Sequence, residues 1–564
     1  MRAGLTALLV IAGCATPHTT GVPVAAASAD PCDASRLVPV AHRDTIERRV
    51  AQKRGSMGRA TRNMVATSHV LATETGRSVL ARGGNAVDAF IAAVLVQDMV
   101  LPGVTSTAGV AGFLVARPGE EPIYVHGPYR APAKAPAGAH VLLPGAAFAL
   151  LEAQERYGRL PLAEVLRPVV ALAREGFTLD PLFAAALAAT PSLRRSPYAQ
   201  RTYFHDGVPF AAGTKVALPE LAATLEAIAR HGASELARGA WASHYVDAVR
   251  AAGGTVELSE LASLHAIFTP ALHARYRGRD VYASSSTSFG GRKLLAGLAV
   301  LEHADLAKLG GIEHSAEALA LFVRTHRAVE AEAWTRDPAY TGERLAQILA
   351  SRGEAIWQRV RQRIEPPAAQ PSPGTHSSAV IVVDESGLVV VGTHSIEGLN
   401  WGDGTFVGGI PLGLSTAGMP TSGRELLDPL SATLVYEDGA PRLALTVYGT
   451  GLHPADLQLV SSVLDLGRDV EAAVLAPRLG WFEFDITKLH TDASRNLLDT
   501  RVPPEVVCRL GALGATLQQT SEPGYPAGLL DLGFPTIVEM RGHGGTRVLT
   551  GMTPEWMKGL AAGD

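Results

Sequence analysis

The feature that most constrains the fold is an abrupt change of pattern near residue 374. Upstream of it, long stretches between residues 74 and 334 carry apolar residues at helical spacing. A proline-rich loop, 365–374, ends this pattern. The next segments, 377–383 and 388–395, are apolar and β-branched and are joined by a polar turn ending in Gly387, which predicts a β-hairpin. Helices followed by strands predict an α/β protein with a layered αββα sandwich.

The composition is that of a large globular protein. The chain has 564 residues, of which 47% are hydrophobic and 18% charged, and this balance argues against a disordered chain. A net charge of -4 argues against a nucleic-acid partner. There is no phosphate-loop lysine motif and no dinucleotide-binding glycine motif after a strand, and the 18 histidines show no zinc spacing. We therefore expect no cofactor and no metal ion.

The N-terminus resembles a bacterial lipoprotein signal. A basic start is followed by an apolar run, 5–11, that is too short to span a bilayer, and then by the sequence Ile11-Ala12-Gly13-Cys14. We expect residues 1–13 to be a signal peptide and Cys14 to be lipidated. The lipid would hold the protein in the bacterial cell envelope, on the periplasmic side of the outer membrane. The alternative is an ordinary signal segment with an incidental cysteine.

The segment after this signal predicts a tether. Residues 14–63 are rich in Ala, Pro, Thr and Ser, so we expect the ordered domain to begin near Met64. Two further cysteines, Cys32 and Cys508, lie far apart in the sequence. An oxidising compartment would permit a disulfide between them, but pairing depends on geometry, so a disulfide and two free thiols both remain open.

Several short motifs follow one another in an order that is typical of one family. They are MVATSH at 64–69, LARGGNAVDA at 80–89, PG at 144–145, YG at 157–158, ALAREGF at 171–177, FHDG at 204–207, YRG at 276–278, FGG at 289–291, RDP at 336–338 and APR at 476–478. Taken together, over nearly the whole chain, they resemble the gamma-glutamyltransferase family of N-terminal-nucleophile amidases. No single motif is specific, but their order is.

The resemblance implies a precursor that cuts its own chain once, where the loop meets the first hairpin strand. The cut would separate a large-subunit region, 64–376, from a small-subunit region, 377–564, and the two would stay associated as one composite domain. The new N-terminal hydroxyl attacks a small amide substrate, and the new α-amine serves as its base. Water or an amine then accepts the acyl group.

Three features place the nucleophile. In the family it lies ten residues before the hairpin glycine and eighteen before a hydroxyl on the return strand, and counting back from Gly387 and from Ser395 both times gives Ser377. The segment Thr393-His394-Ser395-Ile396-Glu397 also resembles the family's return strand. Serine is a departure, since the family normally has threonine here. Thr375 remains an alternative nucleophile.

The same resemblance suggests roles for neighbouring residues. Ser395 would hydrogen-bond the nucleophile, and Glu397 would contact the amino-acid end of the substrate. The oxyanion turn of the family matches a stretch with Thr450 and Gly451, whose backbone amides would hold the developing negative charge.

The residues that recognise glutamate in the family are changed. Pro128 stands where the family has its carboxylate-binding Arg, and Arg130, two positions later, is the substrate-binding candidate. Asp428 and Pro429 replace a Ser-Ser pair, and 411–418 offers no group for an ammonium ion. Losing an Arg clamp should remove gamma-glutamyl selectivity. We therefore expect an acyltransferase or hydrolase for a gamma-glutamyl or other acyl amide. The alternatives are an acylase for a non-glutamyl amide and an inactive binding or structural lipoprotein.

Overall fold

The fold was analysed on a computed structural model. The structure describes Cys32 and residues 55–133, 142–251, 253–363, 377–397, 400–412, 425–449, 452–480, 483–485, 490–492, 497–499, 501–515, 518–519, 533–542, 547–554 and 558–564.

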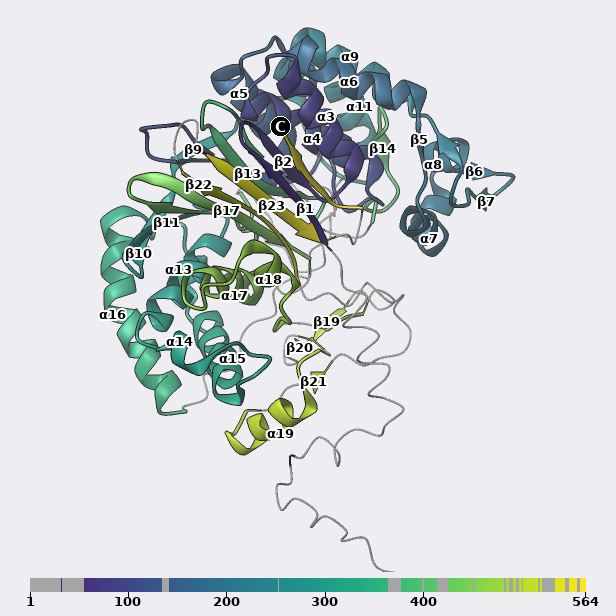
Figure 1. The fold of residues 1–564 in the computed structure, drawn as a ribbon. Helices are drawn as coiled ribbons and strands as arrows, with labels where there is room; N and C mark the ends of the chain where they lie inside the picture. The colour runs from purple at the N-terminus through teal and green to yellow at the C-terminus, as the bar shows by residue number, and fades with distance from the viewer. Residues whose placement is uncertain are drawn as a thin grey trace, which may run out of the picture.

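Two antiparallel sheets of seven strands each form the centre of the molecule (Figure 1). The strands of the first sheet, in spatial order, are β1 (Gly55–Ala60), β23 (Val548–Pro554), β22 (Phe534–Arg541), β17 (Ala440–Tyr448), β16 (Thr433–Glu437), β11 (Arg279–Ala283) and β10 (Leu272–Tyr276). Those of the second are β24 (Leu560–Gly563), β2 (Met64–Thr67), β12 (Ser378–Val383), β13 (Val389–Ser395), β3 (Val110–Ala116), β4 (Ile123–Gly127) and β9 (Ile267–Pro270).

Helices cover the outer face of each sheet (Figure 1). The second sheet is covered by a layer that contains α3 (Val70–Ala81), α4 (Ala86–Val100), α5 (Ala146–Tyr157), α6 (Leu162–Glu175), α9 (Pro219–His231), α10 (Ala233–Arg238), α11 (Ala240–Ala251) and α12 (Leu258–Ala262). The first sheet is covered by a layer that contains α13 (Gly290–Leu301), α14 (Leu306–Leu309), α15 (Ala316–Glu330), α16 (Gly342–Arg361), α17 (Leu452–Leu464), α18 (Val470–Leu475) and α19 (Pro504–Ala512).

The remaining described elements are short. They are α7 (Pro181–Ala189), α8 (Pro197–Tyr203), the 3₁₀ turns at Pro191–Arg195 and Ala333–Arg336, and the strand pairs β5 (Phe177–Thr178) with β8 (Lys215–Val216), β6 (Phe204–His205) with β7 (Val208–Pro209), β14 (Phe406–Val407) with β15 (Ile410–Pro411), β18 (Glu483–Asp485) with β19 (His490–Asp492), and β20 (Leu497–Leu498) with β21 (Gln518–Gln519).

The buried apolar residues fall into layers that match this arrangement. One cluster joins the helices of the second layer to even-numbered residues of β12, such as Val380 and Val382. Odd-numbered residues of the same strand, such as Ile381, instead pack between the sheets against Leu434 and Val538. The alternation follows from the two-residue period of a strand. The predicted αββα sandwich is therefore confirmed.

The predicted hairpin is also confirmed. Strands β12 and β13 pair in register, with Ser378 opposite His394 and Val383 opposite Val389. Gly387 has a φ of 88°, in the region that glycine adopts without steric cost, which explains the glycine at this turn. The turn is fixed to the helical layer because the carboxylate of Asp384 accepts a hydrogen bond from the backbone N–H at the start of α4 (2.9 Å).

The predicted start of the ordered region was wrong. Strand β1 begins at Gly55, inside the stretch 14–63 that the composition assigned to a tether, and pairs with β23 along its full length. The backbone at Gly58 lies so close to β24 that a Cβ atom there would be 2.2 Å from the carbonyl oxygen of Ala561. Gly58 is therefore required by the close packing of these strands.

The two distant cysteines are joined. Cys32 forms a disulfide with Cys508 of α19, with 5.5 Å between their Cα atoms. The sequence allowed either a disulfide or two free thiols, and the structure contains the disulfide.

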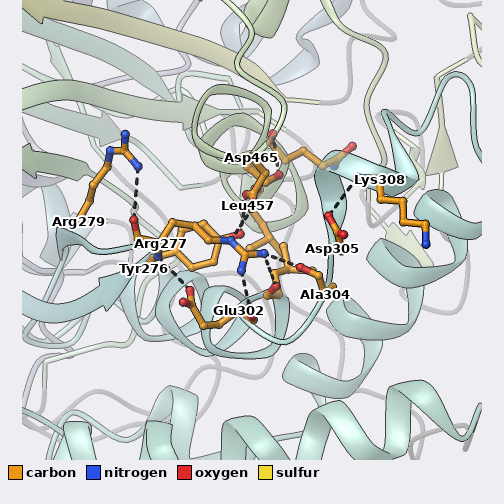
Figure 2. Close-up of polar contacts among 12 residues, drawn as sticks. Tyr276, Arg277, Arg279, Glu302, Ala304, Asp305, Lys308, Leu457 and Asp465 are labelled. Carbon is orange, nitrogen blue, oxygen red and sulfur yellow. Dashed lines mark hydrogen bonds and ion pairs between the residues drawn. The ribbon is translucent and has the colours of Figure 1, made fainter.

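The YRG motif at 276–278 has a structural role (Figure 2). Arg277 lies in the turn between β10 and β11, and its Nε donates to Asp465 Oδ1 (2.7 Å). Its Nη atoms donate to the carbonyl oxygens of Leu301, Glu302 and Ala304 at the C-terminal end of α13 (2.9, 2.9 and 2.6 Å). The Tyr276 hydroxyl donates to the other oxygen of Asp465 (2.6 Å). A cation at a helix C-terminus is favourable, so this Arg277 cluster locks α13 and α17 to the first sheet.

Candidate functional site

Ser377 lies at the start of the central hairpin. It is the first described residue after 364–376, and β12 begins at the next residue. Continuing the hairpin register by one residue places Ser395 opposite Ser377. Both residues are odd-numbered positions of their strands, and odd-numbered neighbours such as Ile381 and Val391 face the space between the sheets. The geometry thus agrees with the pairing expected for Ser377 and Ser395, while their chemical roles stay predictions.

The two adjacent serines of this strand differ in their environment. Ser377 is 2% exposed, and its Oγ has no hydrogen-bond partner among the described residues. The hydroxyl of Ser378 donates to Ser68 Oγ (3.0 Å) in the other direction, toward the helical layer. Buried polar atoms without a partner are rare in folded proteins, and each calls for an explanation. The free hydroxyl of Ser377 is what a nucleophile awaiting a substrate would present.

A polar cluster supports the hairpin from the helical side. Gln97 of α4 donates from Nε2 to the carbonyl oxygen of Ala379 (3.1 Å) and accepts at Oε1 from His394 Nε2 (2.7 Å). The other ring nitrogen of His394 lies 3.2 Å from Asp98 Oδ1. Gln97 and Asp98 were not expected from the sequence. The available signal was a polar pair near the end of a helix whose only other polar residue is Asp88.

Glu397 follows the return strand in an unusual conformation. Its φ is 47°, a left-handed value that is uncommon for a non-glycine residue, and its N–H donates to Ser395 Oγ (2.8 Å). The side chain is 7% exposed, and Oε1 has no hydrogen-bond partner among the described residues. Burial, and secondly the nearby charge of Asp428, raise the pKa of Glu397 well above its usual value.

Asp428 is at the centre of a second buried network. Its Oδ1 accepts hydrogen bonds from the Ser288 hydroxyl (2.7 Å) and from the N–H of Leu430 (3.1 Å), and Oδ2 lies 2.8 Å from His126 Nε2. The Tyr124 hydroxyl is 2.7 Å from Ser288 Oγ. The sequence placed Asp428 near the site but could not identify its partners, which come from distant strands and loops.

Arg130 is already paired. Its guanidinium donates to Ser263 Oγ (3.2 Å) and to Glu425 Oε1 (3.3 Å). A neighbouring apolar cluster packs Val110, which is opposite Ser395, against Leu430. Arg130 thus lies beside the candidate site. To bind a substrate, its guanidinium would have to contact the substrate and Glu425 at the same time.

The remaining predicted residues lie outside the described part of the chain. These are Cys14, Thr375, Thr450 and Gly451. The residues that flank the last two are described: Gly449 ends β17 with a φ of 88°, and α17 begins at Leu452. Tyr448 and Leu452 pack in one cluster with Ala379, two residues after Ser377. The ends of the candidate oxyanion segment therefore lie beside the strand that carries the candidate nucleophile.

Among the described residues, no group of three or more His, Cys, Asp or Glu side chains is arranged to hold a metal ion. None of the described helices combines the length and the apolar composition needed to cross a membrane.

Comparison with known proteins identifies the family. The gamma-glutamyltranspeptidase family model matches residues 72–526. The chain belongs to the gamma-glutamyltranspeptidase family. This is a family of enzymes, amide hydrolases and transpeptidases that act on small amide substrates.

Individual relatives carry two different names. The acylase ACY 1 proenzyme of Pseudomonas sp. (strain SE83) is 25% identical over 473 residues, covering 76% of this chain and 84% of that protein. The glutathione hydrolase proenzyme of Escherichia coli (strain K12) is 25% identical over 472 residues, covering 74% and 81%. The crystal structure of cephalosporin acylase from Bacillus halodurans superposes with a TM-score of 0.76 at 21% identity, covering 91% of this chain and 97% of that one. At this identity the structural match establishes a shared fold.

Proposed function

We propose that this protein is an amide hydrolase or acyltransferase whose nucleophile is the N-terminal hydroxyl of Ser377, freed when the precursor cuts the bond before it. The observation that carries the proposal is the buried Ser377 Oγ, which has no partner among the described residues although the neighbouring Ser378 is hydrogen-bonded. A hydroxyl becomes an effective nucleophile when a base lies beside it, and a free α-amine on the same residue supplies that base.

In this mechanism Ser377 Oγ attacks the carbonyl carbon of the amide and the α-amine takes the hydroxyl proton. The proton then passes to the leaving amine as the C–N bond breaks, leaving an acyl ester on Ser377. Ser395, opposite Ser377 in the register, orients the hydroxyl. Backbone amides at Thr450 and Gly451 hold the oxyanion. Water or an amine attacks the ester and releases the product, and the two chain fragments remain associated throughout.

The acyl group is a separate part of the proposal. The relatives are equally similar to this chain whether they are named acylase or glutathione hydrolase, so identity does not choose between them. We favour an acyl group other than gamma-glutamyl because Asp428 stands where the family resemblance expects a serine that helps to bind a carboxylate.

The decisive experiment compares wild-type protein with Ser377→Ala on a denaturing, reducing gel. We expect wild type to give two fragments, with Ser377 at the N-terminus of the smaller one by mass spectrometry, and Ser377→Ala to remain intact. Thr375→Ala is the matched control and should still be cut. Cleavage before Thr375 would identify Thr375, and not Ser377, as the nucleophile. An intact wild-type chain would favour a binding or structural role for the protein instead.

We also propose that Cys14 is lipidated and anchors the protein in the cell envelope, as the pattern of residues 1–14 suggests. The test is mass spectrometry of protein from membrane extracts of the expressing bacterium. A lipid-modified N-terminal Cys14 is expected, and Cys14→Ser should leave the protein in the soluble fraction. A wild-type chain that begins at another residue would refute the anchor.

A further inference from the structure

An acidic residue, Glu397, is linked through Ser395 to the candidate nucleophile. Ser395, opposite Ser377, accepts a hydrogen bond from the N–H of Glu397 (2.8 Å). Tyr129 joins the segment of Glu397 to that of Asp428: its hydroxyl donates to the carbonyl oxygen of Ile396 (2.8 Å), and its own carbonyl oxygen accepts from the N–H of Leu426 (2.8 Å). The charge of Asp428 also opposes ionisation of the Glu397 carboxyl and raises its pKa. The two residues with carboxyl groups thus lie on separate segments that meet beside the hairpin end that carries Ser377.

The two carboxyl groups differ in their partners. Asp428 is engaged by Ser288, Leu430 and His126, and the charge of Arg292 is also nearby. Among the described residues no ion pair reaches Glu397, which is 7% exposed and has an Oε1 without a hydrogen-bond partner. A buried polar atom of this kind costs free energy until a donor reaches it. The missing partner of Glu397 is therefore a donor or a cation that the described protein does not supply.

The basic residues nearby already have protein partners. The guanidinium of Arg130 is paired with Glu425. Arg292 donates from Nε to the carbonyl oxygen of Thr335 and from Nη2 to those of Ser286 and Ser288. Its Nη1 has no hydrogen-bond partner among the described residues, but its charge already interacts with that of Asp428. Lys293 is paired with Glu330 (2.6 Å). A substrate carboxylate placed here would have to compete for these cations and would face the charge of Asp428, which disfavours it.

We propose that Glu397 and Asp428 form an acyl-group subsite that selects an acyl chain bearing an amine and no carboxylate. On binding, the ammonium group donates to the unpartnered Oε1 of Glu397, and the negative charge of Asp428 repels an acyl carboxylate. The inference rests on the proposed function, since it names the substrate class of that same site.

Three chromogenic anilides that carry their charged groups on the same carbon, counted from the anilide carbonyl, test it. The gamma-glutamyl anilide carries both an amine and a carboxylate, the 4-aminobutanoyl anilide only the amine, and the glutaryl anilide only the carboxylate. We expect kcat/KM with wild-type protein to be highest for 4-aminobutanoyl, by about tenfold or more over glutaryl, as is typical for a charged contact in a buried site. Each rate is corrected with an enzyme-free blank. Equal rates, or a preference for glutaryl, would overturn the subsite.

Single substitutions test whether Glu397 and Asp428 cause the preference for the 4-aminobutanoyl anilide. Glu397→Gln should lower kcat/KM for the 4-aminobutanoyl anilide by about tenfold or more and leave that for glutaryl nearly unchanged. Asp428→Asn should raise the glutaryl rate relative to wild type. Glu471→Gln, on the exposed side of α18, is the control and should change neither ratio. If Asp428→Asn fails to fold, Glu397→Gln decides alone, and an unchanged substrate ratio in that variant refutes the proposal.

A binding measurement separates this inference from the proposed mechanism. Wild-type protein is heated with 4-aminobutanoate or with glutarate, and the shift in Tm is recorded. A stabilising shift with 4-aminobutanoate alone supports the subsite even if no anilide is hydrolysed. A shift with glutarate alone, with both or with neither overturns it. Failure of self-cleavage on a gel, in contrast, refutes the proposed nucleophile and not the subsite.

Discussion

The Arg277 cluster and the Ser377 site are both polar regions at the ends of strands, but they differ in whether their polar atoms have hydrogen-bond partners. Around Arg277, the guanidinium, both oxygens of Asp465 and the hydroxyl of Tyr276 have partners. Around Ser377, its own hydroxyl and one oxygen of Glu397 have none among the described residues. The contrast separates two reasons for keeping polar residues in a fold. Paired groups stabilise the protein, and unpaired ones are retained at a cost where a ligand will complete them.

The strongest test of the comparison is the loss of the unpaired hydroxyl. We expect Ser377→Ala to abolish self-cleavage and to lower amide hydrolysis by at least about a thousandfold, because it removes the nucleophile. The free energy of unfolding should stay the same or rise, since no hydrogen bond is lost. Rates with a chromogenic amide and a chemical unfolding curve measure the two effects. A variant that is much less stable than wild type would show that Ser377 has a structural partner after all.

The converse test removes the central residue of the paired cluster. Arg277→Ala should lower the free energy of unfolding by about 3 kcal/mol, because it leaves the buried carboxylate of Asp465 without its cation. The kcat of the folded protein should not change. Arg279→Ala is the matched control: its partner Glu437 is about one-third exposed, so the loss should be about 1 kcal/mol or less. Equal losses for the two variants would contradict the distinction.

Helix α17 connects the two regions, since it begins at Leu452 beside the site and is followed by Asp465. Burial raises the pKa of Asp456, on this helix, from 3.8 to about 7. A raised carboxyl pKa stabilises the protein below the unfolded value and loses that contribution as the pH rises to the folded value. Relative to Asp456→Asn, wild-type stability should therefore fall by about 1.4 kcal/mol per pH unit between these pKa values and then level off. Parallel unfolding profiles for the two proteins from pH 4 to 8 would refute this.

The smallest effect should come from the paired serine. Ser378→Ala removes a hydrogen bond to Ser68 in the helical layer, so we expect a loss of about 1 kcal/mol in the free energy of unfolding. Self-cleavage should continue, with fragments identical in size to those of wild type. If this variant folds but is not cleaved, Ser378 and not Ser377 would be assigned the catalytic role.

The sequence predicts those parts of the molecule that depend on local pattern. The hairpin and its glycine turn follow from alternation and turn chemistry, whereas the pairing of Ser377 with Ser395 was expected from the spacing in the family. The sequence also marks the break between α3 and α4, although helical periodicity alone does not reveal it. Gly83 has a φ of 91°, and Asn85 caps the next helix.

The rest depends on contacts between distant segments. Strand β1 has no alternating pattern and exists because β23 and β24 lie against it. Similarly, His126 and Ser288 lie 162 positions apart in the chain, yet they contact each other directly and both contact Asp428. No periodicity within either segment predicts this contact, so only the structure identifies the partners of Asp428.

The disulfide has a consequence for the finished enzyme. Cys32 precedes the proposed cleavage point and Cys508 follows it, so a single cut leaves the two products covalently linked. Without a reductant, the mature protein would migrate as one species, and separation would require reduction as well as denaturation. If a lipid is attached at Cys14, it would hold the fragment bearing Ser377 at the membrane through this bond as well. The catalytic piece could then not diffuse away after maturation, even in conditions that weaken the packing between the sheets.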